Sequence, residues 1–152
     1  MMKTKMIVGQ SHQAEGLASY VEQKFASVER HRLDTLSAAE VDDWKTESTH
    51  ILFIIPAKKI PYLQLKRLLS NMPKQHKTTA VTLMTTDGTT AHHAIIQMSL
   101  RGHFPCYTHI QLPEYSVQLK VNGQLIENDK FLKRLRPLEQ MFQSYTFTKT
   151  VS

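Results

Sequence analysis

His50-Ile51-Leu52-Phe53-Ile54-Ile55-Pro56 is the segment that decides the fold. Its central residues, 51–55, are all large and apolar, whereas a strand with one face in water alternates apolar and polar side chains. The run is also far shorter than the roughly 20 apolar residues that a membrane-spanning helix needs. The segment therefore predicts a central strand of a parallel sheet, covered on both faces by helices.

Strand-like and helix-like segments alternate on both sides of this central strand. The alternation predicts the α/β class, with a three-layer, flavodoxin-like, doubly wound, five-stranded parallel sheet in the order 2-1-3-4-5. We expect one such domain over residues 1–152. The expected strands are 5–8, 28–33, 50–56, 78–85 and 107–112, and the expected helices are 14–25, 37–45, 62–72, 91–100 and 131–142.

The C-terminal part of the chain adds two expectations. Asn122-Gly123 lies between the strand-like segments 117–121 and 124–126, which predicts a β-hairpin with a type I′ turn. Pro137 is expected to interrupt the last helix, and the polar residues 146–152 are expected to fray.

The composition excludes several classes of protein. Of the 152 residues, 41% are hydrophobic and 21% charged, which is not the composition of a disordered or collagen-like chain. The single Cys106 excludes an intramolecular disulfide and a Cys-rich zinc site. Without a signal peptide or a long apolar segment, the chain is expected to be cytoplasmic and free of membrane contact. The formal net charge of +6 favours phosphate-bearing partners only weakly.

Ligands of doubly wound sheets bind beyond the carboxyl ends of the strands, near the point where the strand order reverses. This rule selects the loops 9–16, 56–61 and 85–90. The first leads into a helix N-terminus, a potential anion site; the second carries two lysines; the third is rich in hydroxyl groups. The candidate cofactor-binding residues are Ser11, His12, Gln13 and Gly16 in the first loop, Pro56, Ala57, Lys58, Lys59 and Ile60 in the second, and Thr86, Asp87, Gly88 and Thr89 in the third.

Each loop also has a purely structural interpretation. The first is an ordinary capped helix start, where the Glu15 carboxylate stabilises the helix but would repel a phosphate. The lysines of the second loop are then solvated surface residues, and Thr89 or Thr90 is then only the N-cap of the next helix.

The sequence does not indicate a metal site or a catalytic nucleophile. His92 and His93 are adjacent, and adjacent side chains on a helix point about 100° apart, so they are not expected to share a metal ion. Cys106 is expected to be a buried, inert thiol. No catalytic side chain is predicted.

The three loops, taken in order, resemble those of the NADPH-dependent FMN reductase family, which are small flavodoxin-like flavoproteins. That family has Gly-Ser-x-Arg after strand 1, Pro-Glu-Tyr-Asn-Gly-x-x-Pro-x-x-Leu-Lys-Asn after strand 3, and a Gly-rich loop after strand 4. The segments in those places are Gly9-Gln10-Ser11-His12, then Ile51 to Pro56 with Ile60-Pro61-Tyr62-Leu63-Gln64-Leu65-Lys66-Arg67, then 85–90. The ending 121–135 is similar to the family's last turn and helix, and the resemblance covers about residues 3 to 145.

The resemblance implies an FMN-dependent NAD(P)H oxidoreductase. NAD(P)H would reduce the bound FMN, which would pass electrons to a small-molecule acceptor such as a quinone, an azo compound, a metal ion or free flavin. The loop 9–16 would hold the phosphate, the loop 56–61 would flank the flavin ring, and the loop 86–89 would contact the other ring edge. The family also implies a homodimer or homotetramer, with the helices 62–72 and 91–100 as its surface.

Two other functions stay open. A degenerate flavodoxin-like protein that no longer binds flavin, and acts as a binding or regulatory module, is favoured by Glu15 and by Ala57-Lys58-Lys59 in place of Glu-Tyr-Asn. A nucleic-acid partner is suggested by the charge and by the basic residues of the segment 130–136. It is disfavoured because no nucleic-acid-binding motif is present.

Overall fold

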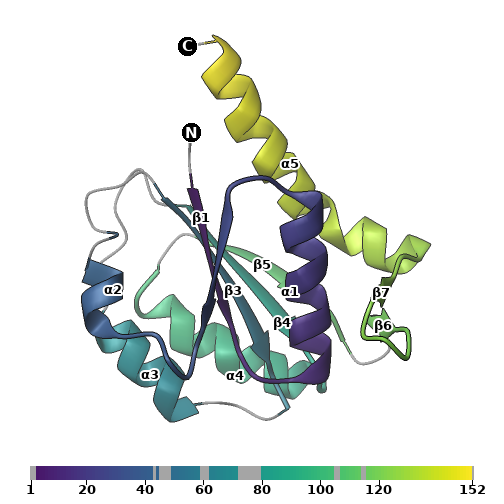
Figure 1. The fold of residues 1–152 in the computed structure, drawn as a ribbon. Helices are drawn as coiled ribbons and strands as arrows, with labels where there is room; N and C mark the ends of the chain where they lie inside the picture. The colour runs from purple at the N-terminus through teal and green to yellow at the C-terminus, as the bar shows by residue number, and fades with distance from the viewer. Residues whose placement is uncertain are drawn as a thin grey trace.

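The computed structural model describes residues 3–42, 44, 49–58, 62–71, 80–104, 107–113 and 116–151. Figure 1 shows a twisted sheet with helices on both of its faces. The strands are β1 (Lys3–Val8), β2 (Val28–Arg32), β3 (Thr49–Pro56), β4 (Ala80–Thr86) and β5 (Thr108–Gln111). They pair in parallel in the order β2-β1-β3-β4-β5, which confirms the predicted α/β class and strand order.

The helices form the two outer layers. They are α1 (His12–Lys24), α2 (Ala38–Asp42), α3 (Tyr62–Asn71), α4 (Thr90–Arg101) and α5 (Asp129–Val151). One core packs against α2, α3 and α4, and the other packs against α1 and α5. Figure 1 shows these two groups of helices on opposite sides of the strands.

The central strand β3 is buried on both faces, as its sequence predicts. Its odd-numbered residues Ile51, Phe53 and Ile55 pack in the core below α2, α3 and α4. Its even-numbered residues Leu52 and Ile54 pack in the core below α1 and α5. Successive side chains of a strand point to opposite faces, so an unbroken apolar run supplies both cores at once.

The hairpin between β5 and α5 forms, but its turn differs from the prediction. β6 (Gln118–Leu119) pairs antiparallel with β7 (Leu125–Ile126). A type I′ turn requires positive φ at two central residues, and only Gly123 has it, with φ 86°. The N–H of Gly123 donates to the Lys120 carbonyl at 2.8 Å, and that of Lys120 donates to the Gln124 carbonyl at 2.8 Å. The loop is therefore a three-residue turn closed by a left-handed glycine.

The last helix also differs from the prediction. α5 passes through Pro137 and continues to Val151, whereas an interruption at Pro137 was expected. Proline removes one backbone donor without preventing a helix that is held on both sides of it. Before Pro137 the helix is anchored by buried Phe131 and Leu135, and after it by Leu138. Within the described residues, each helix is too short or too polar to cross a lipid bilayer.

Candidate functional site

The loops after β1 and β3 touch at Gly9. The Gly9 N–H donates to the Ile54 carbonyl at 2.8 Å. A Cβ at Gly9 would lie 2.5 Å from the ring carbon Cδ of Pro56, which is closer than two carbon atoms can approach. Glycine is therefore needed here to let the two loops meet at the carboxyl edge of the sheet.

The loops after β3 and β4 are joined through their backbones. The N–H groups of Ala57 and Lys58 donate to the carbonyls of Thr86 and Asp87, each at 2.7 Å. Asp87 has a φ of 51° and Gly88 a φ of 130°, so the chain turns sharply after β4. Aspartate tolerates the left-handed region better than most residues.

Ser11 connects the first loop to the third. It is the N-cap of α1, and its hydroxyl accepts a hydrogen bond from the Ala14 N–H at 3.0 Å. The same hydroxyl donates to the Oδ2 atom of Asp87 at 2.6 Å, and the Thr86 hydroxyl donates to that atom at 3.1 Å. All three predicted loops therefore meet at one edge of the sheet.

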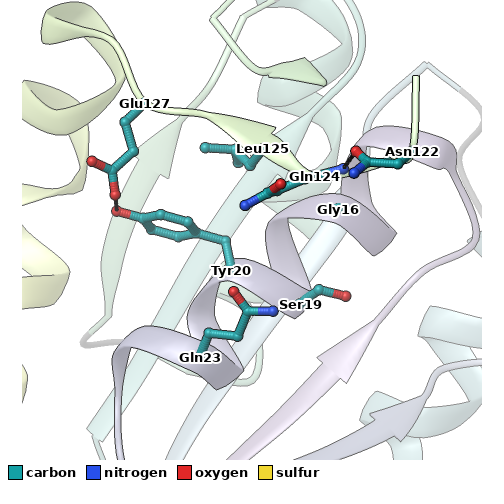
Figure 2. Close-up of a pocket in the computed structure, with 9 residues that line it drawn as sticks. Gly16, Ser19, Tyr20, Gln23, Asn122, Gln124, Leu125 and Glu127 are labelled. Carbon is teal, nitrogen blue, oxygen red and sulfur yellow. Dashed lines mark hydrogen bonds between the residues drawn. The ribbon is translucent and has the colours of Figure 1, made fainter. Parts of the chain in front are cut away.

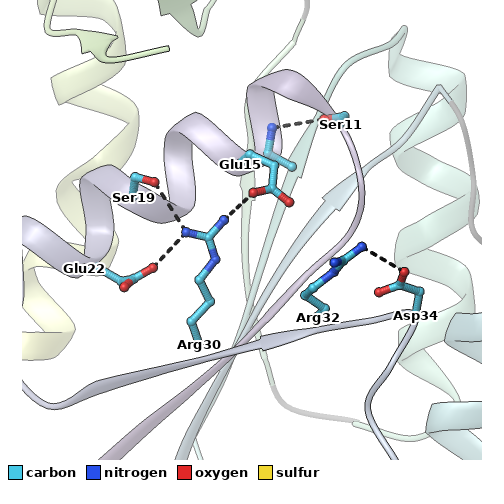
Figure 3. Close-up of polar contacts among 8 residues, drawn as sticks. Ser11, Glu15, Ser19, Glu22, Arg30, Arg32 and Asp34 are labelled. Carbon is cyan, nitrogen blue, oxygen red and sulfur yellow. Dashed lines mark hydrogen bonds and ion pairs between the residues drawn. The ribbon is translucent and has the colours of Figure 1, made fainter. Parts of the chain in front are cut away.

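The carboxylate of Glu15 forms an ion pair with a residue of β2. Figure 3 shows Glu15 on α1 reaching the guanidinium of Arg30, at 2.5 Å. Arg30 also contacts Glu22 at 2.9 Å and the Ser19 hydroxyl at 3.3 Å. This contact offsets the charge of Glu15, which weakens the argument that Glu15 repels a phosphate.

The predicted site residues differ in how accessible they are to a ligand. Pro56 and Ala57 are buried, whereas the side chains of His12 and Lys58 are exposed. Thr89 is the N-cap of α4, and its N–H donates to His92 Nδ1 at 3.2 Å. Lys59 and Ile60, like Pro61 and Cys106, lie outside the described residues.

Gly16 packs against the hairpin and is not part of the three-loop edge. A Cβ at Gly16 would lie 2.5 Å from Leu119 Cδ2 and 3.1 Å from the Gly123 carbonyl oxygen. Gly16 lines an open hollow of about 590 Å³ between α1 and the hairpin (Figure 2), in which Tyr20 donates a hydrogen bond to Glu127 at 2.9 Å. The hollow is lined by Gly16, Ser19, Tyr20, Gln23, Asn122, Gly123, Gln124, Leu125 and Glu127.

Sequence reasoning missed a pair of histidines that share one hydroxyl. The Thr85 hydroxyl at the end of β4 hydrogen-bonds to His93 Nδ1 and, at 3.0 Å, to His109 Nε2. Burial lowers the pKa of His93, and burial together with the proximity of His93 lowers the pKa of His109. Both rings are therefore neutral at neutral pH. No local motif predicts this cluster, because Thr85, His93 and His109 come from three separate elements.

His92 and His93 are the adjacent histidines that were not expected to share a metal ion. His92 turns to Thr89 and His93 to Thr85, so the two adjacent rings have different partners. Among the residues that the structure describes, no three His, Cys, Asp or Glu side chains gather closely enough to hold a metal ion.

The comparisons with known proteins show the fold. No family model matches the sequence, and no curated protein matches it. Among solved structures, the chain is similar to the rubredoxin oxygen:oxidoreductase from the anaerobe Desulfovibrio gigas, with a TM-score of 0.64 and 11% identity. The match covers 99% of this chain and 37% of that one, so the chain spans little more than a third of that protein. At this identity the likeness shows that the chain has a flavodoxin-like fold.

Proposed function

We propose that this chain is a flavin-dependent oxidoreductase module that carries electrons from NAD(P)H through FMN to a small-molecule acceptor. The observation that carries the proposal is the meeting of the three loops at the carboxyl edge of β1, β3 and β4. This is where doubly wound sheets bind their ligands. The likeness to an oxidoreductase in fold and the resemblance of the loops to those of FMN reductases support the same assignment.

The residues of this edge fit the polar parts of a flavin. Gln13 Oε1 is buried without a hydrogen-bond partner among the described residues, so the first loop retains an unused acceptor. The exposed Lys58 lies two residues after the end of β3 and would offer a cation to the ring. A bound flavin would accept a hydride from NAD(P)H and release the electrons to the acceptor. The chain itself would bind and orient the flavin and exclude water from it.

Titration of FMN with the purified protein tests this proposal. We expect the flavin fluorescence to fall at micromolar protein, and we expect flavin-dependent oxidation of NADPH or NADH in the presence of a quinone. Lys58→Ala should weaken flavin binding about three- to tenfold, because an exposed charge contributes roughly 1 kcal/mol. The matched control is Lys120→Ala, which removes an exposed lysine of the hairpin. Absence of quenching with both FMN and riboflavin would contradict the proposal.

A binding module without flavin is the second candidate function. It is favoured by the hydrogen bonds that close the loops on one another, since the N–H groups of Ala57 and Lys58 and the hydroxyl of Ser11 already have partners within the chain. Under this assignment the edge of the sheet is a stable surface and not a cofactor site. The flavin titration distinguishes the two functions.

We also propose that the chain forms a homodimer through α3 and α4. Leu63 on α3 is 73% exposed and Met98 on α4 is 72% exposed, and burying such large apolar side chains between two subunits would be favourable. Met98→Lys should raise the dimer dissociation constant at least about tenfold in sedimentation experiments. Val121→Lys, a substitution at an exposed apolar residue of the hairpin turn, should leave it unchanged. A wild-type protein that stays monomeric at high concentration would refute the dimer.

A further inference from the structure

The carboxylate of Asp87 lies at the N-terminal end of α1. Its Oδ2 atom accepts hydrogen bonds from the hydroxyls of Ser11, the N-cap of this helix, at 2.6 Å and of Thr86 at 3.1 Å. A negative charge in this position is stabilised by the helix dipole. The end of α1 to which the resemblance assigns the FMN phosphate is therefore already next to an anion that belongs to the protein.

The backbone keeps Asp87 in this place. Its carbonyl accepts the Lys58 N–H at 2.7 Å, and the preceding carbonyl of Thr86 accepts the Ala57 N–H at 2.7 Å. The following Gly88 has a φ of 130°, and a Cβ on it would lie 3.2 Å from the Lys58 nitrogen. Because the turn is fixed on both sides, the carboxylate is a built feature of the site and not a side chain that swings in from solvent.

No described cationic side chain forms an ion pair with Asp87. Arg30 is engaged by Glu15 and Glu22. Arg32, shown in Figure 3, contacts Asp34 on the other side of the first loop at 3.1 Å. A phosphate beside Asp87 would therefore meet an unneutralised like charge. At about 4 Å near a protein surface, such a pair changes an affinity by roughly fivefold to several hundredfold.

We infer that Asp87 makes this end of the proposed site select a neutral, hydroxyl-ended flavin side chain over a phosphorylated one. The inference rests on the proposed function, because it concerns the same three loops. A carboxylate accepts hydrogen bonds from hydroxyl groups but repels phosphate oxygens. Riboflavin, whose side chain ends in a hydroxyl, binds at least as tightly as FMN.

Parallel titrations with riboflavin and FMN test the inference. The wild-type protein should bind riboflavin with a dissociation constant no larger than that for FMN. Asp87→Asn keeps an oxygen acceptor for Ser11 and Thr86 but removes the charge, so it should tighten FMN binding at least about tenfold. Its effect on riboflavin should stay below about threefold. The control is Asp34→Asn, which removes a carboxylate already paired with Arg32 and Gln10 and should leave the ratio of the two constants unchanged.

A measurement on the wild-type protein covers the case in which Asp87→Asn does not fold. Raising the salt concentration from about 0.05 M to about 0.5 M should strengthen FMN binding relative to riboflavin, since salt screens the repulsion. Tenfold or greater preference of the wild type for FMN, or an unchanged ratio in folded Asp87→Asn, would overturn the inference and leave the proposed function standing. If neither flavin binds, the proposed function fails and the inference fails with it.

Discussion

Acidification from pH 7 to pH 5 should lower the free energy of unfolding by about 2 kcal/mol through His50 alone. This side chain on β3 is fully buried. Its Nδ1 contacts the Thr4 hydroxyl at 3.1 Å and its Nε2 contacts the Thr82 hydroxyl at 2.8 Å. Burial lowers the pKa of His50 to about 4, so the folded protein holds this ring in its neutral form.

The sign follows from the protons bound in each state. Between pH 6.5 and pH 4 the unfolded chain protonates His50, whereas the folded chain does not, so stability falls as the pH falls. The stabilisation is fully present above about pH 6.5, the ordinary histidine pKa. About 3 kcal/mol is lost once the pH reaches the folded pKa.

Urea unfolding of the wild type and of His50→Gln at both pH values measures this effect. The glutamine keeps a polar partner for the hydroxyls of Thr4 and Thr82 but does not titrate. The wild type should lose about 2 kcal/mol more than His50→Gln between pH 7 and pH 5. His12→Gln, at an exposed histidine, is the control and should show the loss of the wild type. Equal losses in the wild type and His50→Gln would refute the assignment.

Replacing Gly9 by alanine should destabilise the protein by about 1–3 kcal/mol and abolish binding at the three-loop edge. The added Cβ would lie 2.5 Å from Pro56 Cδ, and the proline ring cannot rotate away. The loop after β1 must therefore move away from the loop after β3, which also strains the hydrogen bond from Gly9 to Ile54.

Gly102→Ala is the matched control for this substitution. Gly102 ends α4 with a φ of −71°, and a Cβ there would meet no atom within 4 Å. The control should unfold at the wild-type urea concentration or slightly above it, since alanine restricts the unfolded chain. If Gly9→Ala is as stable as Gly102→Ala and keeps the same ligand affinity, the close contact with Pro56 has no energetic role.

The fold was largely predictable because its signals are local. The apolar run 51–55 specifies a strand buried on both faces without reference to any distant residue. Alternation of strands and helices then leaves few possible topologies. The error in the hairpin turn arose because the hydrogen-bond register between two strands decides the turn type. The hydrogen bond from Lys120 to Gln124 sets the hairpin loop at three residues, and residue types alone do not reveal that register.

The sequence predicted which loops lie together at one edge of the sheet, but it did not predict the contacts between them. Ser11 and Asp87 were both expected at this edge, and the hydrogen bond that joins them there links residues 76 positions apart. No local pattern reports such a contact. Likewise Glu15 was expected to stabilise its helix and to repel a phosphate. Its ion pair with Arg30 could not be predicted, because Arg30 comes from β2 and only the tertiary fold brings β2 beside α1.

The two-sided burial of β3 also constrains how this chain can change in evolution. Odd-numbered residues of β3 face one helical layer and even-numbered residues face the other. Whether a residue number is odd or even therefore determines the core in which its side chain packs. Inserting or deleting one residue within β3 would send every later side chain of the strand to the opposite layer. Substitutions between apolar residues change the packing of one layer at a time, whereas a change of length disturbs both layers together. The length of β3 is therefore under tighter constraint than its composition.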